Sequence, residues 1–464
     1  MGWGTKAQMS NGNTQVLADS VASPSNGGFK RVLSLWDLVL FGLAFVGPTA
    51  PYSMFGLATV KSQGHLPLVY LLAMLVMSLT AISYGRMAAA YPEAGSTYAY
   101  ASKGLHPYLG FVAGWSMILD YVLIPLLSVI YVGLTANKLV PEVPYWLWAV
   151  LTAVGITLIN LRGIRVTARA NFALNAIMIG SLAWFVLVAL RALLGGVGEG
   201  ILFSSKPFYA PEHFAWKPIL GATSLAALSY LGFDGISTLS EDAKNPGKDI
   251  WRATLLVCFL AGGLFVLQSY LGQMVWPDYT TFHPVETAFM DLSKRIGGSA
   301  LYLCVSFVLI VGGLASAITG QASASRLLVG MGRDALLPRR LFAFVHPRLG
   351  TPVYGVVLMG AIHLSGALAL RYAETAELVN FGALLGFMLV NLAVVRHFFF
   401  HLKQRVIGLN LAIPLAAFAV CLCLWVNLSG FALKLGACWL ALGVLYLLVL
   451  TRGFRRTLVS LRFE

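Results

Sequence analysis

The sequence predicts an all-α polytopic membrane protein with twelve transmembrane helices. Of its 464 residues, 58% are hydrophobic and 11% are charged, whereas about 25% of an ordinary soluble domain is charged. Apolar runs of the length that crosses a bilayer, about 20 residues, recur along the whole chain. Two of these runs carry helix-breaking residues near their middle, which bilayer hydrocarbon tolerates only beside protein or a wet cavity.

Counting the apolar runs in order gives the expected transmembrane helices. Their approximate bounds are 34–59, 67–89, 108–137, 144–161, 170–194, 216–240, 253–275, 298–330, 353–370, 376–399, 409–428 and 431–451. The third and eighth runs are long enough to tilt or to continue past the membrane surface.

These runs divide the chain into four expected parts. Residues 1–29 are polar and lack the apolar core of a signal peptide, so we expect a disordered cytoplasmic tail. Residues 30–200 hold the first five helices and residues 201–400 the next five. Residues 401–464 hold the last two helices and a short cytoplasmic tail.

Basic residues predict the orientation in the membrane. With both termini cytoplasmic, the twelve helices place 23 of the 32 Lys and Arg residues on the inner side and 9 on the outer side. An excess of Lys and Arg on cytoplasmic loops is the usual orientation signal. The net charge of +14 therefore reflects topology and attraction to anionic membrane lipid, and no nucleic-acid partner is expected.

Motifs for catalysis or cofactor binding are missing from the sequence. All five cysteines lie inside predicted helices, and Cys421 and Cys423 lack the spacing and companions of a zinc site. No phosphate loop, nucleophile elbow or dinucleotide fingerprint stands in a suitable context. We therefore expect no enzyme activity, no metal and no cofactor.

The two interrupted runs predict where a binding site lies. The first, at 34–59, contains Gly47 and Pro48, and the second, at 216–240, contains Gly232 and Gly235. Paired interruptions in corresponding halves of a chain indicate a secondary transporter whose site is near the membrane midplane.

Three carboxylates at membrane depth are candidates for that site, because ionisable groups there are costly and mark function by default. Asp234 lies between the two glycines of the second interruption, where it could accept a substrate ammonium, carry a proton, or satisfy freed backbone N–H groups. Asp120 could face the same cavity or bond to a neighbouring helix. Glu241, at the end of the sixth run, fits an inner-gate ion pair better than a substrate contact.

Aromatic residues flank both interruptions. Phe45 and Tyr52 surround the first, and Tyr230 and Phe233 surround the second. An aromatic ring there could cap the substrate or hold a cation on its π face.

Several motifs resemble a known superfamily. LSLWDLVLFGLAFVGP, AISYGRMAAAYPEAGSTYAYA, SYLGFDGISTLSEDAKNPGKDI and ASRLLVGMGRDALLPRRLFAFVHPRLGTPVYG are similar to segments of the amino acid–polyamine–organocation permeases. The resemblance covers about residues 30–450. The GFDGISTLSE element, QGHLP and LDYVLIP are most similar to those of bacterial putrescine importers.

The resemblance implies a leucine-transporter-like inverted repeat of five plus five helices, with the first and sixth broken, in a bacterial inner membrane. It also implies that the backbone around both breaks binds substrate. The residues so implied are Ala44, Phe45, Val46, Gly47 and Thr49 at the first break, and Tyr230, Gly232, Phe233, Asp234 and Gly235 at the second. Proton-coupled members often carry a lysine near the position of Met178, so a carboxylate (Asp120, Asp234 or Glu241) would carry the proton here.

Three functions remain as hypotheses. The first is a proton-coupled importer of a small amine, above all putrescine or a related polyamine, or else of a neutral or cationic amino acid, working by alternating access. The second is a channel, which would need a continuous polar pore. The third is a membrane-bound enzyme or sensor, which would need a catalytic constellation or a soluble output domain.

Overall fold

The computed structural model describes residues 33–91, 96–162, 168–240, 243–333, 338–347, 349–451 and 453. Within these ranges every regular element is a helix, and the only β contact is an isolated bridge between Leu33 and Ala243. The predicted all-α class is therefore confirmed. The tail predicted at 1–29 lies outside the described residues.

Helices of the first half of the chain begin at Leu35. They are α2 (Leu35–Val46), α3 (Pro51–Lys61), α4 (Leu66–Ala90), α5 (Ser96–Gly104), α6 (Pro107–Leu139), α7 (Tyr145–Leu161), α8 (Ala168–Leu194) and α9 (Trp216–Ala226). The last of these continues into two 3₁₀ turns, η1 (Ala227–Tyr230) and η2 (Phe233–Leu239).

The second half repeats the pattern of long helices. Its elements are α10 (Pro246–Val275), η3 (Tyr279–Thr281), η4 (Val285–Thr287), α11 (Ala288–Arg333, kinked at Gly298), α12 (Arg339–Phe342), α13 (Val353–Ala369), α14 (Tyr372–Val394), the π-helical turns η5 (Val395–His401) and η6 (Gly408–Ala412), α15 (Ile413–Val426) and α16 (Gly430–Leu450).

Each predicted transmembrane run coincides with helix. Nine helices of the described chain are long and apolar enough to cross a membrane, and the bent pair of α2 and α3 makes ten. The predicted runs 144–161 and 353–370 correspond to two shorter apolar helices, Tyr145–Leu161 and Val353–Ala369. A polytopic membrane protein is therefore confirmed, and the number twelve remains a prediction.

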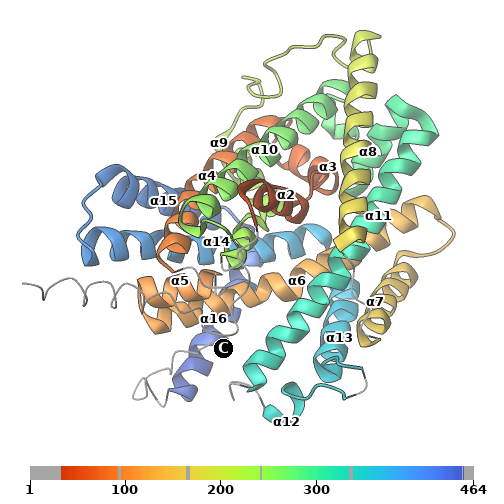
Figure 1. Cartoon of the computed structure of the whole chain (residues 1–464). Helices are drawn as coiled ribbons and strands as arrows, with labels where there is room; N and C mark the ends of the chain where they lie inside the picture. The colour runs from red at the N-terminus through yellow and green to blue at the C-terminus, as the bar shows by residue number, and fades with distance from the viewer. Residues whose placement is uncertain are drawn as a thin grey trace, which may run out of the picture.

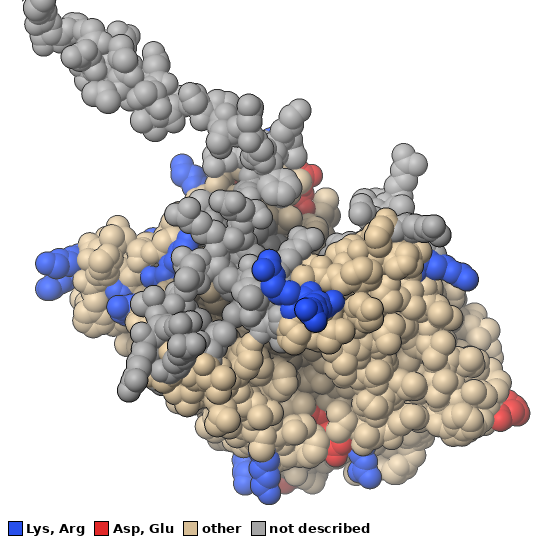
Figure 2. Space-filling model, turned by 90° about the horizontal axis from the view of Figure 1, so that it is seen from below, with Lys and Arg blue, Asp and Glu red and all other residues tan. Residues whose placement is uncertain are grey.

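The surface has the charge distribution of a membrane protein. On the face shown in Figure 2, a broad uncharged area lies between Lys, Arg, Asp and Glu side chains near its rims. Large apolar side chains are exposed on several helices, including Leu187 on α8 and Val449 on α16. Lipid would cover such surfaces in a membrane, because exposed apolar patches of this extent mark interaction surfaces.

The first break separates α2 from α3, where the sequence predicts an interruption. The two helices are bent by 59°, and Gly47 joins them with a φ of 80°. This positive φ suits glycine, which has no Cβ to clash. Pro51 then begins α3, a position where the missing N–H of proline costs no helical hydrogen bond.

The second break lies between α9 and the end of η2. The α-helix ends at Ala226, and the following turns are 3₁₀-helical on both sides of Leu231 and Gly232. Gly232 has a φ of 113°, a conformation that residues with a Cβ rarely adopt. This position also agrees with the interruption that the sequence predicts.

Packing brings the two breaks together at the centre of the molecule. In Figure 1, α2 and α3 lie beside α4, α9 and α10, and α2 contacts η2 directly. A side chain at Gly42 would collide with Ile236 of η2, and one at Gly56 would collide with the backbone of Val285. Helices α14 and α6 pack together on another side, with α15 and α16 beyond α14.

Candidate functional site

Asp234 lies in the first turn of the 3₁₀ segment η2 at the second break. Its Oδ1 accepts a hydrogen bond of 3.3 Å from the backbone N–H of Gly232, one of the groups freed where the helix stops. The residue is intermediate in burial, so part of it is accessible as well as bonded to the break. The role of satisfying backbone N–H groups and the role of meeting a ligand are therefore compatible.

Asp120 approaches the same place from the middle of α6. Its side chain is 6% exposed, and its Oδ1 has no hydrogen-bond partner among the described residues. A side chain at Gly382 of α14 would come within 3.3 Å of that oxygen, so glycine there leaves room beside the carboxylate. Asp120 and Asp234 are close enough for their charges to interact. Neither has a Lys or Arg within ion-pair distance in the described chain.

Aromatic side chains surround the second break. Phe233 packs against Phe387 of α14 at 5.2 Å between ring centroids and against Tyr84 of α4 at 5.8 Å. The Tyr84 hydroxyl lies 2.6 Å from Thr97 Oγ1 of α5. Tyr121, beside Asp120, is 44% exposed and interacts electrostatically with both carboxylates.

The end of α2 packs against the second break. Phe45 is 56% exposed, and its ring lies where a side chain at Gly232 or Gly235 would be. Ala44 is also exposed, whereas Val46 is buried. The structure thus brings Phe45 to the second break, although the sequence places it beside the first.

Several backbone polar groups of the first break are hydrogen-bonded within the chain. The N–H of Gly47 donates to Leu43 O, and that of Ala50 donates to Gly47 O. Pro48 has no N–H, and Thr49, whose carbonyl accepts from Tyr52 N–H, is 6% exposed. Few donors are left here for an anionic ligand.

Tyr52 and Tyr230 lie in packed aromatic surroundings rather than beside the carboxylates. The Tyr52 ring stacks on Phe289 of α11 at 3.9 Å and is 1% exposed. The Tyr230 hydroxyl donates to the carbonyl of Tyr70, at 2.9 Å. Their predicted substrate contacts remain predictions, as does the gate role of Glu241, which lies outside the described residues.

A known family matches almost all of this chain. The family model for amino acid permeases aligns with residues 38–443, a range that includes both breaks and both carboxylates. The chain belongs to the amino acid permease family. The permease is thus a membrane transporter and not an enzyme.

Curated relatives of this permease extend over nearly its full length. The low-affinity putrescine importer PlaP of Escherichia coli (strain K12) is 33% identical over 430 residues, 92% of this chain and 95% of its own. The branched-chain amino acid permease BcaP of Bacillus subtilis (strain 168) is 27% identical over 93% of this chain and 96% of its own. The methylthioribose transporter of the same bacterium is 26% identical over 93% of this chain and 95% of its own.

An ion pair ties the other end of α3 to the bundle. Lys61, the last residue of α3, pairs with Glu377 of α14, whose side chain is almost wholly buried. The second carboxylate oxygen of Glu377 accepts the N–H of Ser429, at 2.8 Å. The contact joins α3, α14 and the start of α16 on the side of the molecule that the predicted orientation makes extracellular.

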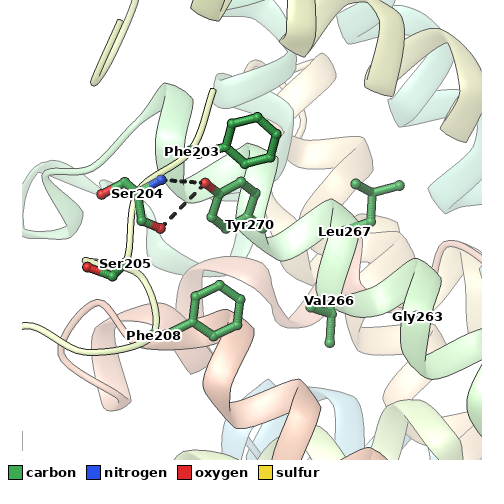
Figure 3. Close-up of a pocket in the computed structure, with 8 residues that line it drawn as sticks. All are labelled: Phe203, Ser204, Ser205, Phe208, Gly263, Val266, Leu267 and Tyr270. Carbon is green, nitrogen blue, oxygen red and sulfur yellow. Dashed lines mark hydrogen bonds between the residues drawn. The ribbon is translucent and has the colours of Figure 1, made fainter. Parts of the chain in front are cut away.

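A separate pocket of about 610 Å³ lies between the segment 203–208 and α10. Figure 3 shows Phe203 and Phe208 on one side and Leu267 on the other, with the Tyr270 hydroxyl bonded to the backbone of Ser204. No acidic residue lines this pocket. It therefore lacks the chemistry of an amine site.

Sequence reasoning missed Tyr84, Thr97 and the helix α5. Their segment, AISYGRMAAAYPEAGSTYAYA, is one of those that resemble the superfamily. Its many Ser, Thr and Tyr residues could have indicated polar contacts to the site. The short helix contacts η2, α6 and α14, which explains how its polar side reaches the second break.

Proposed function

We propose that this permease is a secondary active importer of a small amine, above all putrescine or a related polyamine, coupled to protons and working by alternating access. Two carboxylates, Asp120 and Asp234, are close enough for their charges to interact, and neither has a Lys or Arg within ion-pair distance in the described chain. That single observation carries the proposal, because buried carboxylates need a compensating positive charge. The amine would supply it.

The backbone supports an amine over a zwitterionic amino acid. An α-amino acid would place its carboxylate on freed N–H groups of a broken helix. Here the N–H groups of Gly47, Ala50 and Leu231 donate within the chain, and that of Gly232 donates to Asp234. The breaks therefore offer acceptors more readily than donors.

Proton coupling would use the same two carboxylates. Acidic residues at membrane depth often form proton relays in transporters, and Asp120 and Asp234 are two such acids whose charges interact here. Proton-coupled members of the superfamily often carry a lysine near the position of Met178 on α8. In this chain Met178 packs against Gly312. Alternating access would require the Lys61–Glu377 contact to open and close.

Uptake into proteoliposomes tests this proposal. We expect saturable uptake of labelled putrescine that increases when the outside is made more acidic than the inside. Spermidine should compete strongly, whereas alanine and leucine should not. Inhibition by zwitterionic amino acids that is lost when their carboxylate is amidated would contradict the amine assignment and favour an amino acid permease like BcaP.

We further propose twelve membrane-spanning helices in an inverted repeat of five plus five, in a bacterial inner membrane with both termini cytoplasmic. The two breaks, in the first helix of each set of five, and the 23-to-9 division of basic residues support it. In a background without native cysteines, single cysteines at 199–213 or 278–287 should react with an impermeant reagent from outside. Labelling at 244–250 from outside would contradict the orientation.

A further inference from the structure

The carbonyl of Pro48 is released by the first break. The N–H of Tyr52, which would reach it in a continuous helix, donates to Thr49 instead, at 3.0 Å. A freed carbonyl at membrane depth needs another donor, because hydrocarbon supplies none. Gln268 of α10 provides it, since its Nε2 lies 2.9 Å from Pro48 O and 3.0 Å from Leu264 O.

These two contacts determine which end of the Gln268 amide faces the break. Both partners are carbonyl oxygens, which accept hydrogen bonds, so only the NH₂ end can face them. A flipped amide would place its own oxygen against two others. Oε1 is therefore directed elsewhere, and it has no partner among the described residues although Gln268 is 0% exposed.

A buried acceptor without a partner loses the hydrogen bond that water would give it. The neighbouring Gln273 shows the satisfied alternative on the same helix, because its Oε1 accepts from Leu66 N–H and its Nε2 donates to Gly64 O. Both polar atoms of the Gln273 amide are thus hydrogen-bonded within the protein. The Gln268 amide bonds the first break through its nitrogen, and its oxygen has no partner among the described residues.

We propose that Gln268 Oε1 accepts a hydrogen bond from an N–H group of the transported amine, which makes Gln268 a specificity-determining residue on α10. This inference rests on the proposed function. The amide then links the two parts of the site, because its nitrogen holds the broken backbone and its oxygen binds the ligand. A neutral acceptor near the first break and two carboxylates at the second suit a ligand with more than one N–H-bearing group.

Two substitutions separate ligand binding from support of the backbone. Gln268→Met keeps the length of the side chain and loses both the donor and the acceptor. Gln268→Glu loses the donor to Pro48 and keeps an acceptor. If Oε1 binds the amine, we expect Gln268→Met to raise the KM for putrescine about tenfold or more, as for a hydrogen bond to a charged group. Gln268→Glu should keep the KM within about threefold of the wild-type value or lower it, because a charged acceptor binds an ammonium at least as well.

Gln273→Met is the matched control, because it removes a buried glutamine from the same helix. It should lower the melting temperature and leave the KM unchanged. The shift in melting temperature that putrescine causes in each purified variant provides a second measurement for any variant with poor uptake.

The outcomes distinguish this inference from the proposed function. If the wild-type protein neither takes up nor is stabilised by any amine, the proposed function fails and the inference with it. If the wild-type protein transports putrescine and Gln268→Met has an unchanged KM, the inference alone is wrong. Equal increases in KM for Gln268→Met and Gln268→Glu would also overturn it, because Gln268 would then act only through the backbone of the break.

Discussion

Replacing Asp234 with asparagine is expected to reduce amine uptake at least about 30-fold. Losing one partner of a desolvated charge pair costs roughly 2–5 kcal/mol, and about 1.4 kcal/mol corresponds to a factor of ten. Asparagine has the size of aspartate and keeps a carbonyl oxygen that can accept the N–H of Gly232. The break should therefore persist while the charge that meets the ammonium is lost. Initial rates of uptake, normalised to the protein in each proteoliposome preparation, measure the effect.

Asp278→Asn is the control for this variant. Asp278 is an exposed residue that caps the turn η3, so removal of its charge should change uptake less than about twofold, as for most surface substitutions. Wild-type uptake by Asp234→Asn, with the pH dependence also unchanged, would show that Asp234 only satisfies the backbone of the broken helix.

The sequence predicts both helix breaks because their cause is local. Gly47, Pro48 and Gly232 disrupt a helix wherever it packs, and hydrophobicity alone identifies the long helices around them. Asp120 and Asp234 could be selected for a similar reason, since a carboxylate in an apolar run is conspicuous without knowledge of its neighbours.

The walls of the site could not be predicted in the same way, because they depend on how distant helices cross. Gln268 and Gln273 are both buried glutamines of α10, and only the crossing of α10 past the first break leaves one of them with a free oxygen. Phe45 reaches the second break because α2 packs against η2. Tyr52, on the other side of Gly47 in the chain, packs instead against Phe289.

The short helix α5 was missed for a compositional reason. Its sequence STYAYASKG is polar and lacks the apolar run by which membrane helices are recognised. It forms because it packs between α6 and α14, and tertiary contacts supply most of the stability of so short a helix. A prediction based on hydrophobicity therefore treats this segment as a loop.

Replacing Asp120 is expected to separate stability from transport. Without substrate, Asp120 Oδ1 is buried and has no partner among the described residues, and the charge of Asp234 is nearby. An unsatisfied buried group costs about 1–3 kcal/mol, and like charges repel. Asp120→Leu, which is apolar and similar in size, should therefore keep or raise the melting temperature of the unliganded protein. Uptake should fall at least about 30-fold, for the reason given for Asp234.

Asp120→Asn is the companion variant, because it keeps polarity and removes only the charge. It should lose transport to a similar extent, although its two new N–H donors make its melting temperature less informative than that of Asp120→Leu. The alternative role for Asp120 is a hydrogen bond that holds α6 against a neighbouring helix. That role predicts the opposite pattern, in which Asp120→Leu melts several degrees lower and uptake falls only in proportion to the folded protein recovered. A carboxylate retained for transport should instead lower the stability of the protein when no substrate is bound, since functional sites commonly keep polar groups at a cost in stability.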